Sequence, residues 1–147
     1  MADSFPTLIG KVIHHCGALE FLTNGAIKTL STDVLLSGEI SKLSFARRIE
    51  ILRVLLRERT ELSKASSKQL CDLLSEIARR RNEVAHNPIM TGGPDASAAE
   101  RIVVVRHQGG KADVKKEISQ DDLRNLVTNT REAIELFLKL LPSSTHV

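Results

Sequence analysis

The chain has 147 residues, of which 41% are hydrophobic and 27% charged; this length and composition fit one domain with its own core and exclude a disordered protein. Its 21 basic and 18 acidic residues give a net charge of +3, but residues 42–81 hold eleven basic and five acidic side chains. A basic middle segment favours an anionic partner such as nucleic acid, although an ordinary solvated helix face has the same composition.

The two cysteines, Cys16 and Cys71, are too few for a disulfide-stapled secreted domain, and both fall in apolar helical patterns. We therefore expect buried free thiols and a reducing, cytoplasmic location. The N-terminal residues lack the basic and apolar regions of a signal peptide, and no stretch reaches the roughly 18 apolar residues of a membrane helix. The sequence thus predicts a soluble protein without a membrane partner.

Apolar residues at steps of three and four predict a first helix over residues 8–30, whereas residues 32–41 are ambiguous. The same periodicity predicts a second helix over residues 45–57, for which Ser44 is a suitable N-cap. A third helix is expected to begin at residues 66–69, which fit a capping box. It should end at about His86, because Pro88 disfavours helical geometry at the residue before it.

A β-hairpin is predicted after a break at residues 91–94, because the β-branched segments 101–107 and 112–118 flank a Gly-Gly turn. The last helix should begin at residues 119–122 and stop at Pro142. We expect a single, mainly all-α domain over residues 1–142, followed by a frayed tail at 143–147. Its fold class is a four-to-five-helix up-and-down bundle with the hairpin (about 101–118) inserted before the last helix.

One segment, residues 79–88, combines several groups that can carry chemistry at the end of the third predicted helix. The apolar rhythm of this helix continues onto Arg81, so its guanidinium should meet an anion, either a protein carboxylate or a bound phosphate. Asn82 and His86 are four residues apart, which places them on one helix face. Arg81 and His86 lie roughly 140° apart on a regular helix, so their convergence requires a distorted helix end or a second copy of the helix.

This segment resembles the signature of the HEPN superfamily, which consists of all-helical domains in which an Arg is followed four to six residues later by a His. The residue after that Arg is commonly Asn, Asp or His, and here the segment reads Arg81, Asn82, three further residues and His86. As in that family, the motif falls on a late helix of a predicted bundle. The motif match covers about ten residues, and the fold-level match covers most of the chain.

The resemblance implies a metal-independent endoribonuclease that needs no cofactor and acts as a homodimer with a composite site. His86 would act as general base or acid at the RNA 2′-hydroxyl or the leaving 5′-oxygen. Arg81 would stabilise the charge on the phosphoryl oxygens, and Asn82 would orient the histidine or contact phosphate. The products would carry 2′,3′-cyclic phosphate and 5′-hydroxyl ends. A toxin or defence role, with a cognate antitoxin or regulatory protein as partner, is the expectation at the family level.

Two departures from the family qualify this expectation. Pro88 stands where one toxin subgroup has a tyrosine that its partner enzyme modifies, so that mode of neutralisation is excluded here. Many family members have lost catalysis, so the alternative function is a non-catalytic interaction module that binds nucleotide, nucleic acid or a partner protein. In a purely structural role, Arg81 would pair with a buried acid such as Glu20 or Glu76 while His86 caps the helix.

Further candidates surround the motif. Additional phosphate contacts are predicted for Arg79, Arg80, Arg47 and Arg48. Helix periodicity predicts that the side chain of Arg80 is more exposed than that of Arg79. For Arg47 and Arg48, the alternative is ordinary pairing with acidic side chains on the helix surface. Supporting roles are predicted for Glu20 and Asn24, which otherwise belong to a solvated helix face. No metal site is expected, because His14, His15 and Cys16 are adjacent on a helix and point in different directions.

Overall fold

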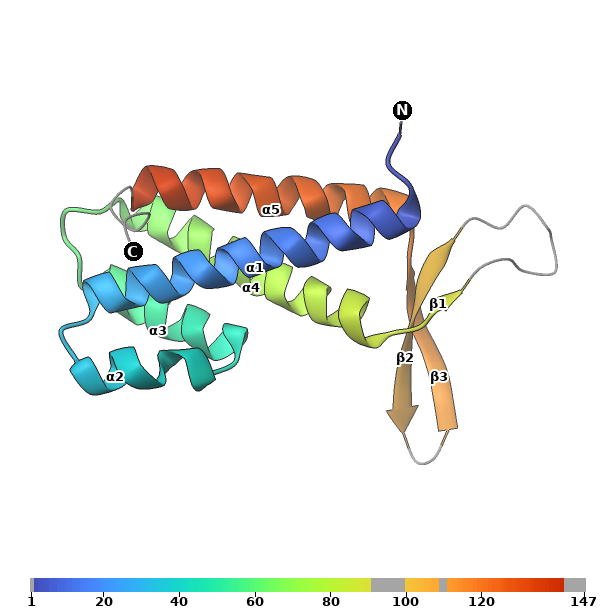
Figure 1. Ribbon diagram of the computed structural model, residues 1–147, viewed down its shortest axis with the longest axis horizontal. Helices are drawn as coiled ribbons and strands as arrows, with labels where there is room; N and C mark the ends of the chain where they lie inside the picture. Colours follow the sequence, from blue (N-terminus) through green and yellow to red (C-terminus); the bar gives the residue numbers. More distant parts are fainter. Residues whose placement is uncertain (1, 91–99, 109–110, 142–147) are drawn as a thin grey trace.

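The computed structural model describes residues 2–90, 100–108 and 111–141, with the side chains of 106–108 left aside. In this part of the chain, the structure is mainly helical and confirms the predicted bundle with a small antiparallel sheet before the last helix (Figure 1). Its helices are α1 (Phe5–Leu30), α2 (Val34–Glu39), the 3₁₀ helix η1 (Ile40–Lys42), α3 (Phe45–Arg57), α4 (Lys64–His86) and α5 (Gln120–Leu140). The ambiguous segment 32–41 thus contains α2 and the start of η1.

The long helices bury one apolar stripe each against their neighbours. Helix α1 lies along α5, and α4 packs against both α3 and α5 (Figure 1). Fully buried side chains from all four helices meet in one core, among them Val12, Leu19, Leu52, Leu74 and Phe137. Burial of each such side chain stabilises the fold by about 1.5–3 kcal/mol relative to exposure. Both free thiols lie in this core, as the sequence predicts.

Serine residues cap the beginnings of four described helices, and the caps of α3, α4 and α5 test the predicted starts. The Ser44 hydroxyl accepts a hydrogen bond from the Arg47 amide, which confirms the predicted start of α3. Helix α4 begins earlier than expected, because its N-cap is Ser63, whose hydroxyl accepts from the Ser66 amide. The prediction of a capping box at residues 66–69 was therefore wrong. At the start of α5, Ser119 and Asp122 form a capping box, and this helix ends just before Pro142.

The sheet has three antiparallel strands in the order β1 (Ile89–Met90), β2 (Arg101–Gln108) and β3 (Lys111–Ile118). The two long strands match the predicted hairpin, whereas the short β1 was not predicted. Ile102 pairs with Ile118 at the base of the hairpin, and both are buried, which attaches the sheet to the bundle. The sheet projects from one end of the bundle (Figure 1). The predicted turn at 109–110, the break at 91–94 and the tail at 143–147 lie outside the described residues.

Candidate functional site

The motif segment occupies the last turns of α4, which stays α-helical through His86. Asn87 caps this end: its side-chain amide donates to the Glu83 carbonyl oxygen at 2.7 Å, and its Oδ1 accepts from the Val105 amide at 3.1 Å. The Lys116 ammonium lies 2.7 Å from a Glu83 carboxylate oxygen. Strands β2 and β3 therefore hold the motif helix in place through Asn87 and Glu83, two residues that the sequence did not mark as functional.

A cavity of about 320 Å³ lies beside the motif, where the beginning of α3 meets α1 and α4. It is lined by Glu20, Ser44, Phe45, Ala46, Ala78, Arg81 and Asn82. Three of the predicted site residues, Glu20, Arg81 and Asn82, thus come together in one place. His86 is exposed on the last turn of α4 and does not line this cavity.

Arg81 reaches the cavity without a carboxylate partner. Its Nη1 donates to Asn82 Oδ1 at 3.2 Å, and its Nε is buried without a hydrogen-bond partner. No ion pair of Arg81 occurs within the described residues, because the two acids considered for it are engaged elsewhere. Glu20 pairs with Arg48 and Glu76 pairs with Arg79. Asn82, for which the sequence suggested orienting His86 or contacting phosphate, accepts a hydrogen bond from Arg81.

Arg48 is a structural cation that links α3 to α1. The residue is 7% exposed, and its guanidinium donates to Glu20 Oε2 at 2.7 Å and to Asn24 Oδ1 at 2.8 Å. Its Cζ also lies 5.8 Å from the centre of the Phe45 ring. The interpretation of Glu20 and Asn24 as a solvated helix face is therefore wrong. The prediction of Arg48 as a phosphate contact does not fit its burial, since both Nη groups are bound inside the protein.

The other arginines predicted to contact phosphate differ in how strongly carboxylates of the protein bind them. Arg79 is bound by Glu76 at 2.6 Å and Glu83 at 2.8 Å on the surface of α4. Arg80 turns toward α5, where it lies 3.8 Å from Asp122. Its side chain is 23% exposed against 51% for Arg79, so the expectation that Arg80 is the more exposed of the two was wrong. Packing of α4 against α5 covers Arg80, which periodicity within one helix does not reveal.

Arg47, in contrast, is exposed at the start of α3 and forms no ion pair with the residues that the structure describes. It lies directly after Ala46, which lines the Arg81 cavity. Among the predicted additional contacts, Arg47 is therefore the one whose charge stays available near the motif.

Two residues of the motif's neighbouring helix α1, His15 and Cys16, have other contacts. No group of three or more His, Cys, Asp or Glu side chains that could hold a metal ion occurs in the described segments. His15 contacts Thr130 rather than a ligand cluster, with Nδ1 2.8 Å from the hydroxyl oxygen. Burial raises the pKa of Cys16 to about 11, although the nearby Arg81 guanidinium acts in the opposite direction. Cys16 is therefore an inert thiol beside the cavity.

Comparisons of the chain with protein-family models, with curated proteins and with solved structures found no match. The described helices also include none with the length and apolar character needed to cross a membrane.

Proposed function

We propose that this protein is a metal-independent endoribonuclease of the HEPN type that cleaves RNA at a composite site in a homodimer. The observation that carries this proposal is the state of Arg81, a cation in a cavity whose buried Nε has no partner, and whose charge has no carboxylate partner, among the described residues. A guanidinium with free donors is suited to the oxygens of a phosphodiester, which accept paired, charge-assisted hydrogen bonds. Asn82 holds this guanidinium from the adjacent position.

The position of His86 favours a homodimer. Helix α4 is regular through His86, so Arg81 and His86 of one chain point roughly 140° apart. A distorted helix end is therefore not the way in which they converge. A second copy related by a two-fold axis would bring its exposed His86 to the Arg81 of the first copy, and the reverse, which creates two equivalent sites.

In this site, RNA cleavage needs only groups that the protein and the RNA supply. His86 takes the proton of the 2′-hydroxyl, and the 2′-oxygen then forms a bond to the adjacent phosphorus. The bond between phosphorus and the 5′-oxygen breaks, and the 5′-oxygen leaves with a proton from the imidazolium. Arg81 stabilises the negative charge that collects on the phosphoryl oxygens. The products are a 2′,3′-cyclic phosphate and a 5′-hydroxyl end.

RNA cleavage in the presence of EDTA tests this proposal. Wild type should cleave and leave cyclic-phosphate ends, whereas Arg81→Ala and His86→Ala should each lose at least about 100-fold in rate. Lys115→Ala, a change of an exposed lysine on β3, is the matched control and should cleave like wild type. Equal cleavage by all four proteins would indicate a contaminating ribonuclease, and that result, like no cleavage of a broad RNA panel, contradicts the proposal.

A second candidate is a non-catalytic module that binds a nucleotide, a nucleic acid or a partner protein through the same face. It is favoured by the exclusion of His86 from the cavity that holds Arg81 and Asn82. In that case, RNA binding would depend strongly on Arg81 and weakly on His86, with no turnover. A cytoplasmic toxin or defence role with an antitoxin partner belongs to the nuclease proposal and rests on the family resemblance alone.

A further inference from the structure

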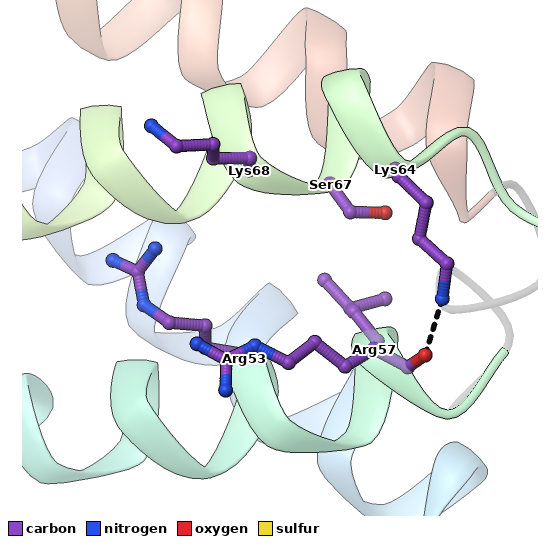
Figure 2. A pocket seen from close by; sticks show the side chains of 6 residues that line it. Arg53, Arg57, Lys64, Ser67 and Lys68 are labelled. Atoms are coloured by element: carbon purple, nitrogen blue, oxygen red, sulfur yellow. Dashed lines mark hydrogen bonds between the residues drawn. The ribbon is translucent and has the colours of Figure 1, made fainter.

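A second cavity, of about 220 Å³, lies between α3 and α4, where α3 ends and α4 begins. Figure 2 shows side chains from both helices around it. Its lining contains four cations and no carboxylate: Arg53, Leu56, Arg57, Lys64, Ser67 and Lys68. Such a concentration of positive charge around a concave site favours an anionic ligand.

The charge of this cavity is only partly balanced inside the protein. Arg53 and Lys68 share one carboxylate, Asp72, at 2.8 Å and 2.6 Å, and Glu50 lies 3.7 Å from Arg53. Arg57 and Lys64 form no ion pair with the described part of the chain. The Lys64 ammonium donates to the Arg57 carbonyl oxygen (Figure 2), which leaves two further protons for a ligand. Four cations thus face two carboxylates.

Ser67 provides an independent observation that points to a ligand. The residue is 7% exposed, and its hydroxyl oxygen is buried without a hydrogen-bond partner. Figure 2 shows this hydroxyl directed toward Lys64 on α4, whereas the Arg57 side chain on α3 extends away from both, toward Arg53. Buried polar groups in native proteins are almost always hydrogen-bonded, so an orphaned hydroxyl at this place indicates a partner that enters the cavity.

We propose that this cavity binds the phosphate group of a small phosphorylated molecule. Phosphate oxygens accept hydrogen bonds from the ammonium of Lys64 and from the hydroxyl of Ser67, and the fork of Arg57 joins them when its side chain turns from Arg53 toward Lys64 (Figure 2). The cavity is smaller than the roughly 300–1,000 Å³ of sites for drug-sized ligands, which favours a phosphate or diphosphate group over a whole nucleotide or a nucleic-acid strand. The positive end of the α4 dipole adds to the attraction, and the Lys64 ammonium, bound to the Arg57 carbonyl oxygen, offsets the opposing negative end of α3.

Binding here does not depend on RNA cleavage. Lys68 and Arg81 are thirteen residues apart on α4, roughly 20 Å along the helix, so the two cavities share no lining residue. Variants of the second cavity therefore leave Arg81, Asn82 and His86 unchanged, and loss of one function says nothing against the other.

Calorimetric titration with inorganic phosphate and with pyrophosphate, at low ionic strength, tests the site. Pyrophosphate should bind wild type with one site per chain. The double variant Arg57→Gln/Lys64→Gln should bind it at least about 10-fold more weakly. The charge-matched double variant Lys111→Gln/Lys115→Gln, which alters exposed lysines on β3, should bind it like wild type. Equal weakening in both double variants, or no binding to wild type, overturns the proposal.

Ser67→Ala separates a ligand contact from a purely structural role. This change should weaken pyrophosphate binding about 10-fold, because a hydrogen bond to a charged group is lost. It should not lower the melting temperature of the ligand-free protein, since it removes a buried hydroxyl that has no partner there. Unchanged pyrophosphate affinity in Ser67→Ala contradicts the assignment of Ser67 to the site.

Discussion

At the scale of single residues, the surroundings of the motif depend on which of two nearby arginines binds Glu20. Glu20 reaches both the Arg81 cavity and the Arg48 guanidinium, but it pairs with Arg48. The side chain of Arg48 is 8% exposed and that of Glu20 is 28% exposed. Removing Glu20 should therefore cost more stability than removing Arg48, because an Arg48 charge left alone has less access to water than a Glu20 charge left alone.

We predict that Glu20→Gln lowers the free energy of unfolding by about 2–3 kcal/mol, because it leaves the Arg48 charge buried and only partly bound. Arg48→Met should cost about 1 kcal/mol or less, since it removes the buried charge and leaves Glu20 partly solvated. Urea unfolding followed by circular dichroism measures both. Glu39→Gln, which breaks an exposed pair with Lys42, is the control and should cost less than about 0.5 kcal/mol. A larger loss for Arg48→Met than for Glu20→Gln would contradict the assignment of the buried charge.

His15 connects α1 to α5 in a particular tautomer. The Thr130 hydroxyl donates its only proton to the Val127 carbonyl oxygen at 2.7 Å, so it accepts from His15, whose Nδ1 must carry the proton. Burial, followed by the charge of Arg131, lowers the pKa of His15 below its ordinary value of 6.5. The folded protein therefore holds His15 neutral at pH values where the unfolded chain already binds a proton.

This difference predicts a loss of stability in acid. A group with a lowered folded pKa stabilises the folded state above its unfolded pKa, so the contribution of His15 is present above pH 6.5 and decreases as the pH falls toward the folded value. His15→Asn keeps a side-chain N–H donor but does not titrate. As the pH falls from 7.5 to 5, the unfolding free energy of wild type should therefore decrease more than that of His15→Asn. A constant difference over this range would show that His15 titrates alike in both states.

At the scale of elements, periodicity predicted the helices well and their ends less well. The stripes over 8–30 and 45–57 correspond to α1 and α3, because apolar spacing reports directly which face is buried. The start of α4 was misplaced because both Ser63 and Ser66 are good N-caps, and only Ser66 is followed three residues later by a glutamine. The short strand β1 has no sequence signal of its own, since Ile89 and Met90 become a strand only through pairing with β2.

The start of α4 can be tested by two matched serine variants. Ser63→Ala should lower the free energy of unfolding by about 1 kcal/mol, because the Ser66 amide loses its acceptor. Ser66→Ala should change it by less than about 0.5 kcal/mol, since alanine favours the helix interior. Thermal unfolding of both variants gives the comparison, and an equal or larger loss for Ser66→Ala contradicts the cap at Ser63.

The candidate site was predictable in part. The sequence identified Arg81 as a cation out of place in an apolar stripe, and the structure locates it in a cavity beside Asn82 and Glu20. Which acid pairs with which arginine was not predictable, because Glu20, Arg48 and Glu76 lie on different helices whose packing the one-dimensional pattern does not contain. For the same reason the role of Asn87 was not predictable, because its side chain accepts a hydrogen bond from Val105 on β2, a strand distant in the sequence.

At the scale of the whole molecule, α3 and α4 run beside each other with one cavity near each end of the pair. The cavity at the beginning of α3 holds Arg81, and the sheet beyond it ties down the end of α4 that carries His86. A single chain thus presents Arg81 and His86, the proposed phosphate-binding and proton-transfer groups, on different faces of one helix. If the protein is the proposed ribonuclease, its catalysis requires two chains, with Arg81 and His86 acting across their interface.

Mixing two inactive variants tests this claim most directly. Arg81→Ala and His86→Ala, each inactive alone, are combined in equal amounts, allowed to exchange subunits and assayed for RNA cleavage in EDTA. With random exchange, half of the dimers are mixed and each has one intact site of two, so the mixture should recover about one quarter of wild-type activity. A mixture that stays as inactive as its components, beside an active wild type, would contradict a site shared between chains.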